Sequence, residues 1–152
     1  DWEQEAQKAS CRTVYVRTSM VLAKDGGAMK KLLPLFKMNL GSRLGSGQQW
    51  MSWIHIEDIA NLFIFALENQ EVEGAINACS PHPVQNKLFT EILAKAVDRG
   101  TVIPVPEFAL KLALGEMSEM VLFSQRGSAD KIQRLGFKFK YPNLNEALAS
   151  IV

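Results

Sequence analysis

Two segments of the chain carry apolar residues at the spacing of one face of an α-helix. The first set is Ile59, Leu62, Phe63, Ala66 and Leu67, and the second is Phe89, Ile92, Leu93, Ala96 and Val97. Both follow i, i+3, i+4, i+7 and i+8, which predicts two amphipathic helices. Glu57 or Asp58 places an acidic group near the start of the first helix, and Asn86 can cap the second.

Three segments have the composition of strands. Residues 12–22 are rich in β-branched and aromatic side chains and nearly continuous in their apolar character, which is typical of a strand covered on both faces in a parallel sheet. Residues 49–54 and 74–79 are shorter predicted strands. Because strands alternate with helices along this part of the chain, the order predicts an α/β fold with parallel crossovers.

The segments around these elements are shorter or interrupted. Residues 2–8 have the pattern of the end of a helix, and residues 28–38 predict a short helix that ends or kinks around Pro34. Three glycines in residues 41–47 predict a loop.

Beyond residue 100 the pattern changes. Residues 102–106 are extended and interrupted by prolines, and a helical region follows over residues 107–124. Residues 136–142 alternate apolar and charged side chains, as a half-exposed strand would. Residues 143–146 resemble a capping box at the start of a terminal helix.

Composition narrows the class of protein. The 152 residues are 47% apolar, 22% charged and 9% aromatic, and the net charge is +1, which excludes collagen, coiled-coil arrays and intrinsic disorder. The chain has no block of basic residues of the kind that binds nucleic acids or anionic membranes. No apolar run reaches the ~18–20 residues of a membrane helix. The isolated Cys11 and Cys79 favour a reduced, cytoplasmic protein.

The chain contains no complete sequence motif for phosphate binding, metal binding or a nucleophilic serine. Residues 41–47 lack the Lys-Ser/Thr pair of a P-loop, and their glycine spacing reverses that of a dinucleotide loop, so a plain glycine turn is the better interpretation. His55 and His82 do not have metal-ligand spacing, and we expect a hydrogen-bonded structural role for His55 and a loop position for His82. No serine stands in a nucleophile-elbow sequence.

Several stretches nevertheless resemble one enzyme family. Residues 45–60, with a glycine turn, a strand and Ile56-Glu-Asp-Ile59 opening a helix, resemble extended short-chain dehydrogenases/reductases, and residues 14–22 resemble the sixth Rossmann strand of those enzymes. More narrowly, the chain resembles the sugar-nucleotide-epimerase-like subfamily of atypical extended reductases. The stretches that carry this narrower resemblance, in order along nearly the whole chain, are residues 2–3, 17–22 with 26–28, 49–55, 114–122 with 124–126, and 136–142.

The resemblance implies the C-terminal part of a Rossmann-type NAD(P)-binding reductase. Residues 1–100 would be the remainder of the Rossmann domain with interleaved substrate-pocket segments, and residues 101–152 a C-terminal helical subdomain. The family's glycine-rich NADP loop and Tyr-x-x-x-Lys pair are absent, since Tyr15 is followed four residues later by Ser19, and Tyr141 by Asn145. We therefore expect a fragment that begins after the nucleotide-binding half, with no catalytic residue of its own.

By family position, the remaining residues would form one wall of the site. Thr18, Ser19 and Met20 would pass beside the nicotinamide of NADP. The substrate pocket would be lined by Gln49, Trp50, Trp53 and His55. Core packing is the alternative for the two tryptophans.

Two departures from the family pattern affect the interpretation. Met51 stands where nucleotide-sugar epimerases commonly carry an arginine that clamps the substrate diphosphate, which disfavours a UDP-sugar. Residues 124–130 lack the apolar residues and proline that usually follow Arg126, which affects the local C-terminal conformation but not the fold.

Two functional hypotheses remain open. In the first, the chain is the C-terminal part of an NADP-dependent oxidoreductase or epimerase that acts on a small carbonyl or sugar-like substrate, and it is inactive alone. In the second, it is a stand-alone binding or assembly module that forms a homodimer or pairs with a partner through the exposed edge of residues 13–22. Neither hypothesis involves a metal, a nucleic acid or a membrane.

Overall fold

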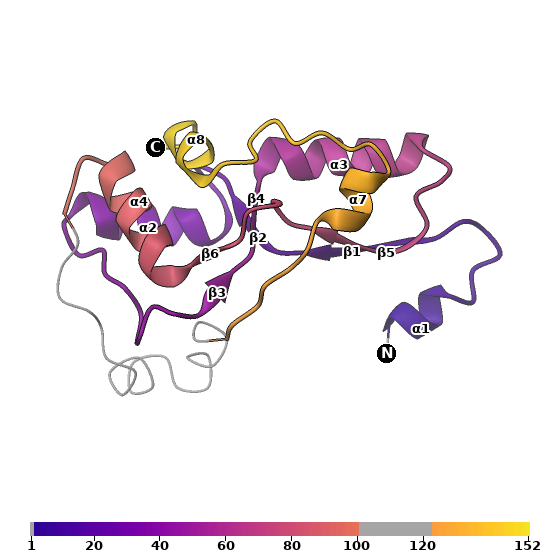
Figure 1. Ribbon diagram of the computed structural model, residues 1–152, viewed down its shortest axis with the longest axis horizontal. Coiled ribbons are helices and arrows are strands. Elements are labelled where there is room, and N and C mark those ends of the chain that lie inside the picture. The colour runs from indigo at the N-terminus through magenta and orange to yellow at the C-terminus, as the bar shows by residue number, and fades with distance from the viewer. Residues whose placement is uncertain (1, 101–122) are drawn as a thin grey trace.

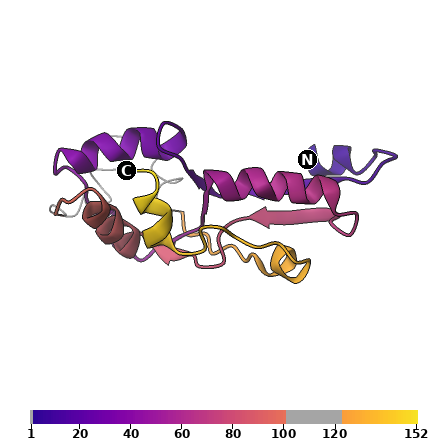
Figure 2. The same cartoon turned by 90° about the horizontal axis from the view of Figure 1, so that it is seen from above.

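The computed structural model describes residues 2–100 and 123–152, which form two groups of elements lying end to end in an elongated molecule (Figures 1 and 2). The strand group contains β1 (Val14–Thr18), α3 (Ile56–Glu68), β5 (Gly74–Ala78) and α7 (Asp130–Arg134). The helix group contains α2 (Gly27–Lys37), α4 (Asn86–Ala96) and α8 (Leu144–Ala149). The short elements are β2 (Met20–Leu22), β3 (Trp50–Met51), β4 (Trp53–His55), β6 (Val84–Gln85) and α1 (Trp2–Ala6).

The described strands form three pairs. β1 pairs with β5 in parallel, and β2 pairs with β4 in parallel, which confirms the predicted α/β order with parallel crossovers. β3 and β6 form a short antiparallel pair. All three pairs have only two strands, so side-chain packing on the helices has to supply most of the stabilisation.

The prediction of a single strand over residues 12–22 is wrong, because the chain changes partner at Ser19. The Ser19 N–H donates to the carbonyl of Ala78 at 3.2 Å, whereas the Met20 N–H donates to the carbonyl of Ser52 at 3.2 Å. The predicted coverage of both faces is wrong as well: Tyr15 is buried, but Arg17 and Thr18 are exposed. The predicted strand over residues 49–54 is likewise divided, at Ser52, into β3 and β4.

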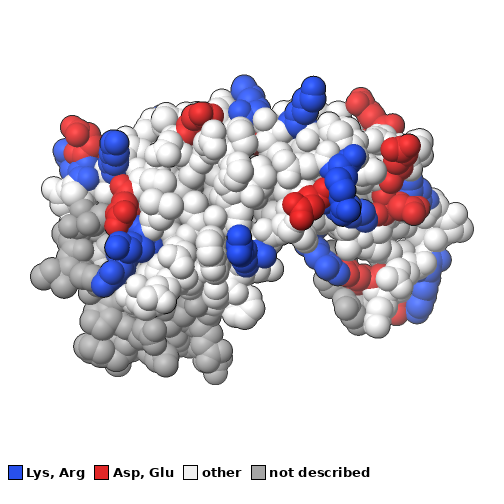
Figure 3. All heavy atoms as spheres, viewed as in Figure 1, with Lys and Arg blue, Asp and Glu red and all other residues white. Residues whose placement is uncertain are grey.

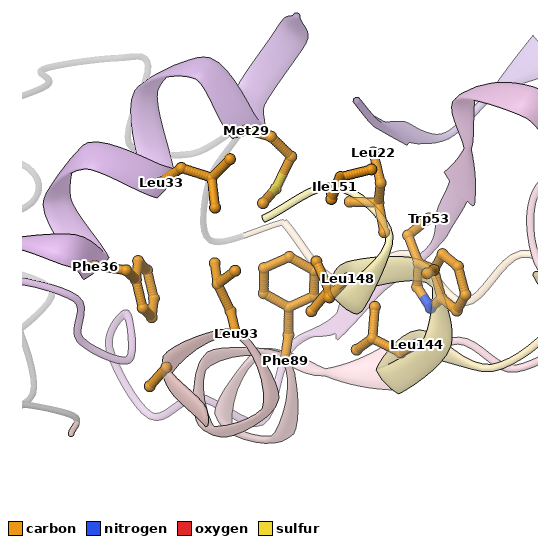
Figure 4. Close-up of a cluster of buried hydrophobic side chains, with 12 residues drawn as sticks. Leu22, Met29, Leu33, Phe36, Trp53, Phe89, Leu93, Leu144, Leu148 and Ile151 are labelled. Carbon is orange, nitrogen blue, oxygen red and sulfur yellow. The ribbon is translucent and has the colours of Figure 1, made fainter. Parts of the chain in front are cut away.

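Two hydrophobic clusters stabilise the two groups. Figure 4 shows the first, in which α2, α4 and α8 converge beside the β2–β4 pair. Each large side chain buried there contributes about 1.5–3 kcal/mol. Its members are Leu22, Met29, Leu33, Phe36, Trp53, Phe89, Leu93, Ala94, Leu144, Ala147, Leu148 and Ile151. The second cluster packs α3 and α7 against β5, through Ile54, Ile59, Leu62, Ala66, Val72, Ile76, Ala78, Cys79, Ala129, Ile132 and Phe137.

The three helices predicted between residues 28 and 97 exist as α2, α3 and α4, with two corrections. Asn86 does not cap α4: the preceding residue, Gln85, occupies the N-cap, and the buried Asn86 side chain bonds to groups on other segments. Pro34 does not end α2, which continues to Lys37, and a kink at Pro34 stays a prediction. A proline removes one helix hydrogen bond, but the neighbouring Leu33 and Phe36 are buried in the first cluster and hold this turn in place.

The C-terminal segment departs from its alternating pattern. Residues 136–142 form no strand, and the Lys140 and Tyr141 N–H groups donate to the Asp58 carboxylate instead. The predicted terminal helix exists as α8, directly after Asn143. Its capping box does not form, because the Asn143 side chain bonds to the Glu146 side chain rather than to the helix backbone.

The predictions for residues 102–106 and almost all of 107–124 lie outside the described residues. The division at residue 100 stays a prediction; within residues 123–152, α7 joins the second cluster and α8 joins the first. In the part of the chain that the structure describes, no helix has the length and apolar character to cross a membrane. On the face in Figure 3, acidic and basic side chains are interspersed rather than gathered in one patch of either sign.

Candidate functional site

The carboxyl ends of β1 and β5 meet where the strand group joins the helix group. Thr18 and Ala78 are the last paired residues of the two strands. Ser19 holds the two strand ends together, because its N–H and its hydroxyl both donate to the carbonyl of Ala78, at 3.2 and 2.8 Å. Met20 then turns into β2 and pairs beside Trp53. The crevice outside the carboxyl ends of parallel strands is where open α/β sheets bind ligands.

A cavity of about 450 Å³ opens at this point. Its walls come from the end of β1 and start of β2, one face of α2, β3, and the segment around Gln125. The described lining residues are Thr18, Ser19, Met20, Ala28, Lys31, Leu32, Leu44, Trp50, Met51, Ser52, Asn86, Phe123 and Gln125. The three residues predicted to lie beside the nicotinamide therefore share one cavity with Trp50.

The wall opposite β1 depends on a backbone contact between β3 and the C-terminal segment. The Gln125 N–H donates to the carbonyl of Trp50 at 3.1 Å, and the Ser52 hydroxyl donates to the carbonyl of Gln125 at 2.9 Å. The Ser52 oxygen also accepts from the Gly127 N–H at 2.7 Å. The guanidinium of Arg126 lies over the Trp50 ring, 4.6 Å from its centroid, which orients the indole by a cation–π contact.

Asn86 connects the glycine loop to the cavity. Its Oδ1 accepts from the Leu44 N–H at 2.9 Å, and its Nδ2 contacts the Met51 sulfur at 3.3 Å. Met51 is half-buried and presents a thioether, with no charge, to the cavity. The loop itself turns through Gly45 and Gly47, whose positive φ values of 56° and 71° suit glycine. This supports a structural role for the loop.

The other three predicted pocket residues lie elsewhere and do not line this cavity. The Gln49 side chain is buried and donates to the carbonyl of Leu44 at 3.1 Å. Trp53 is fully buried in the first cluster, and its indole N–H donates to the carbonyl of His82 at 3.1 Å. His55 is also buried. A direct contact of these three side chains with a substrate stays an untested prediction that this cavity does not support.

His55 is a hydrogen-bonded structural residue, as expected from its surroundings. Its Nδ1 accepts from the Glu57 N–H at 3.2 Å and so caps α3. Its Nε2 lies 3.0 Å from the Ser150 hydroxyl oxygen, and since that hydroxyl donates to the carbonyl of Ala147, the oxygen accepts from Nε2–H. Burial lowers the pKa of His55, against the opposing effect of Asp58. The neutral imidazole is the form that makes both bonds.

Asp58 fixes the C-terminal segment to α3. Its two carboxylate oxygens accept from the Lys140 N–H at 2.7 Å and the Tyr141 N–H at 3.0 Å, and it is 1% exposed. On the surface, the Lys140 ammonium pairs with Glu57 at 2.6 Å, and this hydrogen bond lowers the pKa of Glu57. These contacts explain why an acidic pair at the start of α3 serves the fold rather than acid–base chemistry.

A smaller cavity of about 140 Å³ adjoins the strand ends and shares Thr18, Ser19, Ser52 and Gln125 with the larger one. It also reaches Cys79, whose pKa is raised to about 11, chiefly by burial. The thiol is therefore protonated at neutral pH and is a poor nucleophile. Among the described residues, no group of three His, Cys, Asp or Glu side chains could hold a metal ion.

Lys31, Asn86 and Gln125 belong to the cavity, and the sequence did not point to them. Lys31 lies in the short helix predicted over residues 28–38, and Asn86 begins a helix predicted from apolar spacing. Neither prediction says which polar side chains face a ligand. Gln125 reaches the site only through its pairing with Trp50, 75 residues away along the chain. No local signal could have found it.

Comparison with known proteins identifies the family. The sequence profile of the NAD dependent epimerase/dehydratase family matches residues 2–79. The chain belongs to this family. Residues 105–151 match a second profile, described as a domain of unknown function (DUF1731). The resemblance to epimerase-like extended reductases seen in the sequence is thereby confirmed.

Individual relatives agree over almost the whole chain. The chain is 42% identical to the chloroplastic epimerase family protein SDR39U1 homolog of Arabidopsis thaliana, covering 100% of this chain and 44% of that protein. The crystal structure of the human epimerase family protein SDR39U1 (isoform2) with NADPH superposes with a TM-score of 0.93 at 34% identity, over 99% of this chain and 52% of that one. A nucleoside-diphosphate sugar epimerase from Corynebacterium glutamicum gives a TM-score of 0.70 at 30% identity, over 97% and 28%.

These matches describe the fold and the extent of the chain. The α/β arrangement is the Rossmann-like fold of epimerase family proteins, which confirms the predicted fold class at that level. The chain spans about half the length of the curated relatives it matches.

Proposed function

We propose that this chain forms one wall of the nicotinamide and substrate site of an NADP-dependent epimerase-family oxidoreductase. The observation that carries the proposal is the cavity at the carboxyl ends of β1 and β5, which brings Thr18, Ser19 and Met20 together with Trp50. The substrate is a small carbonyl or sugar-like compound. The family membership supports a nicotinamide cofactor, and the human relative solved with NADPH supports NADP.

The residues at this strand end fit the nicotinamide end of such a cofactor. Ser19 is held by two bonds to Ala78, so the backbone beside it offers a fixed surface, and Met20 adds a polarisable apolar contact. When bound, NADPH supplies a hydride to a carbonyl carbon, and the proton that completes the alcohol comes from an acid outside this chain. The role left to these residues is to orient the reacting groups and exclude water.

We further propose that the chain is the C-terminal part of the enzyme and has no activity alone. It lacks the glycine-rich loop and the Tyr-x-x-x-Lys pair that the resemblance requires for nucleotide binding and acid–base chemistry. Its relatives are about twice as long, which leaves length for both. Residues 1–100 would complete the Rossmann domain with interleaved substrate-pocket segments, and residues 101–152 would form a C-terminal helical subdomain.

A cavity-filling substitution tests the proposal in the full-length enzyme. Met20→Trp places an indole in the cavity and should lower kcat/KM for NADPH-dependent carbonyl reduction by at least ~10-fold, because small displacements of a substrate cost that much. Met38→Trp, at a methionine that is 60% exposed, is the matched control and should leave kcat/KM unchanged. Equal activity of Met20→Trp and the wild type, or NADPH turnover by residues 1–152 alone, would contradict the proposal.

A second candidate function, an assembly module, is favoured by one surface. Within the described residues β1 is bonded only to β5, so its other edge is unpaired. In the same group of elements, α3 carries a stripe of exposed apolar side chains at helical spacing. These are Ile56, Phe63, Ile64 and Leu67, which are 44%, 47%, 52% and 73% exposed. Contiguous exposed apolar side chains are a feature of contact surfaces, and this stripe supports the second candidate.

Oligomeric state separates the two candidates. If residues 1–152 form a homodimer through this surface, sedimentation will give a dimer that Leu67→Glu dissociates, while Leu88→Glu, at a leucine 46% exposed on α4, leaves it intact. If the stripe is covered by the rest of the enzyme, Leu67→Glu will instead destabilise the full-length protein more than Leu88→Glu does.

A further inference from the structure

We infer that the cavity accepts a flat, largely apolar carbonyl compound that carries one carboxylate, and that Lys31 pairs with that carboxylate. The inference rests on the proposed function and names the substrate class of the same site. It depends on three features of the described residues: the chemistry of the cavity wall, the face that α2 turns toward the cavity, and the lack of an acidic partner for Lys31 among these residues.

The cavity wall is mostly apolar. Seven of its described residues offer hydrocarbon, thioether or aromatic surface: Met20, Ala28, Leu32, Leu44, Trp50, Met51 and Phe123. Thioethers and an indole suit the face of an aromatic or otherwise flat ligand. The polar members are uncharged hydroxyl and amide groups, apart from Lys31. Such a lining suits an apolar ligand body with a few directional hydrogen bonds.

Lys31 is turned toward the cavity by the geometry of α2. Ala28, Lys31 and Leu32 stand at i, i+3 and i+4, so they share one face of the helix, and all three line the cavity. Lys30 and Lys31 are both exposed, but Lys30 does not line the cavity. The two adjacent lysines therefore carry the same charge, but only Lys31 lines the cavity, which makes Lys30 a matched control.

The charge of Lys31 is not neutralised by another described residue. The cations in the ion pairs between described side chains are Lys8, Arg17 and Lys140. No described lining residue is acidic, and Lys31 is the one described lining residue with a charged side chain. An anionic group on the ligand would therefore meet a favourable potential.

One ammonium limits how much negative charge the ligand can carry. A carboxylate brings a single charge, which one lysine balances, whereas a phosphate monoester carries about −1.5 to −2 at neutral pH. A diphosphate needs several cations or a bidentate guanidinium, and the uncharged Met51 supplies neither. The described wall thus matches a carbonyl compound with one carboxylate better than a sugar nucleotide.

A matched pair of substrates tests this in the full-length enzyme. We would compare NADPH-dependent reduction of 4-carboxybenzaldehyde with that of methyl 4-formylbenzoate, which has a similar ring but no charge. Lys31→Met should raise KM for the carboxylate about fivefold, as for an ion pair with one exposed partner, and leave KM for the ester unchanged. Lys31→Arg should retain most of the preference, and Lys30→Met should behave as the wild type.

The outcomes separate this inference from the proposed function. If the wild type reduces both substrates and Lys31→Met changes KM for both equally, or for neither, Lys31 does not bind the carboxylate and the inference is overturned. If the enzyme reduces other carbonyls but neither of these, the substrate class is wrong and the oxidoreductase proposal stands. If no carbonyl is reduced with NADPH, both fail.

Discussion

Asp58 is the buried charge on which the C-terminal segment depends. Its carboxylate accepts two backbone hydrogen bonds, from Lys140 and Tyr141, at 2.7 and 3.0 Å. Asp58→Asn keeps one acceptor oxygen but places an NH₂ group against the other N–H, so we expect a loss of about 2–3 kcal/mol in the free energy of unfolding. Urea unfolding measures this loss. Asp25→Asn, at an exposed turn, is the control and should change stability by less than ~0.5 kcal/mol.

His55 makes stability depend on pH in one direction. Burial lowers its pKa in the folded chain, whereas in the unfolded chain the pKa returns to about 6.5. The unfolded state therefore binds the proton first as pH falls. The stabilisation is fully present above about pH 6.5 and is lost as pH falls from there toward the lowered pKa of the folded state.

This pH dependence can be measured by urea unfolding at about pH 7.5 and about pH 5.5. His55→Asn keeps a side-chain acceptor for the Glu57 N–H but cannot titrate, so its unfolding free energy should vary less between the two conditions. Glu57, Asp58 and Lys140 also act on His55. The pKa of Glu57 is lowered and that of Lys140 is raised, so neither group titrates between these two conditions. An unchanged pH dependence in His55→Asn would therefore contradict this role of His55.

Single residues were predictable from sequence only where the chemistry is local. The structural role of His55 follows from Ile54 and Ile56 on either side and Asp58 nearby. Trp50 and Trp53 have the same composition around them, yet one lines the cavity and the other is fully buried. Burial depends on α4 and α8 packing over Trp53, which no spacing within residues 49–55 encodes.

At the scale of elements, the loop after α2 packs closely on that helix. A Cβ at Gly41 would lie 2.4–2.6 Å from ring atoms of Phe36, which belongs to the first cluster. Gly41→Ala should therefore displace the ring and destabilise the chain by about 1–3 kcal/mol. At Gly100 a Cβ would meet no atom of the described residues within 4 Å, so Gly100→Ala is the matched control. Similar thermal midpoints for both variants would contradict the close packing.

Helices were predictable and strand divisions were not. α3 and α4 follow a period that the sequence repeats over several turns. In α3, however, only Ile59, Leu62 and Ala66 of the predicted apolar face are buried, whereas Phe63 and Leu67 are exposed. The composition of residues 12–22 and of residues 49–54 predicts one strand in each segment. The backbone changes its pairing partner at Ser19 and at Ser52, and side-chain composition gives no information about such a change. Residues 136–142 alternate as a strand would, but the buried Asp58 captures the N–H groups of Lys140 and Tyr141.

At the scale of the whole molecule, the cavity lies where the two groups of elements meet. β1 and β2 belong to different strand pairs, and the chain passes between them at Ser19. The wall of the cavity then combines α2 from the helix group with the Gln125 segment that leads to α7. The fold class, the strand end and Trp50 were accessible from sequence through local patterns and family resemblance, whereas the contributions of Lys31, Asn86 and Gln125 to the cavity required the tertiary structure.

The measurement that most directly tests the proposed function is a crystal structure, with NADPH, of the longer enzyme that we propose includes this chain. The account predicts that the nicotinamide ring contacts the strand end at Thr18, Ser19 and Met20, with the 450 Å³ cavity open beside it toward Trp50. A nicotinamide bound elsewhere, with this strand end in contact with neither cofactor nor substrate, would contradict it.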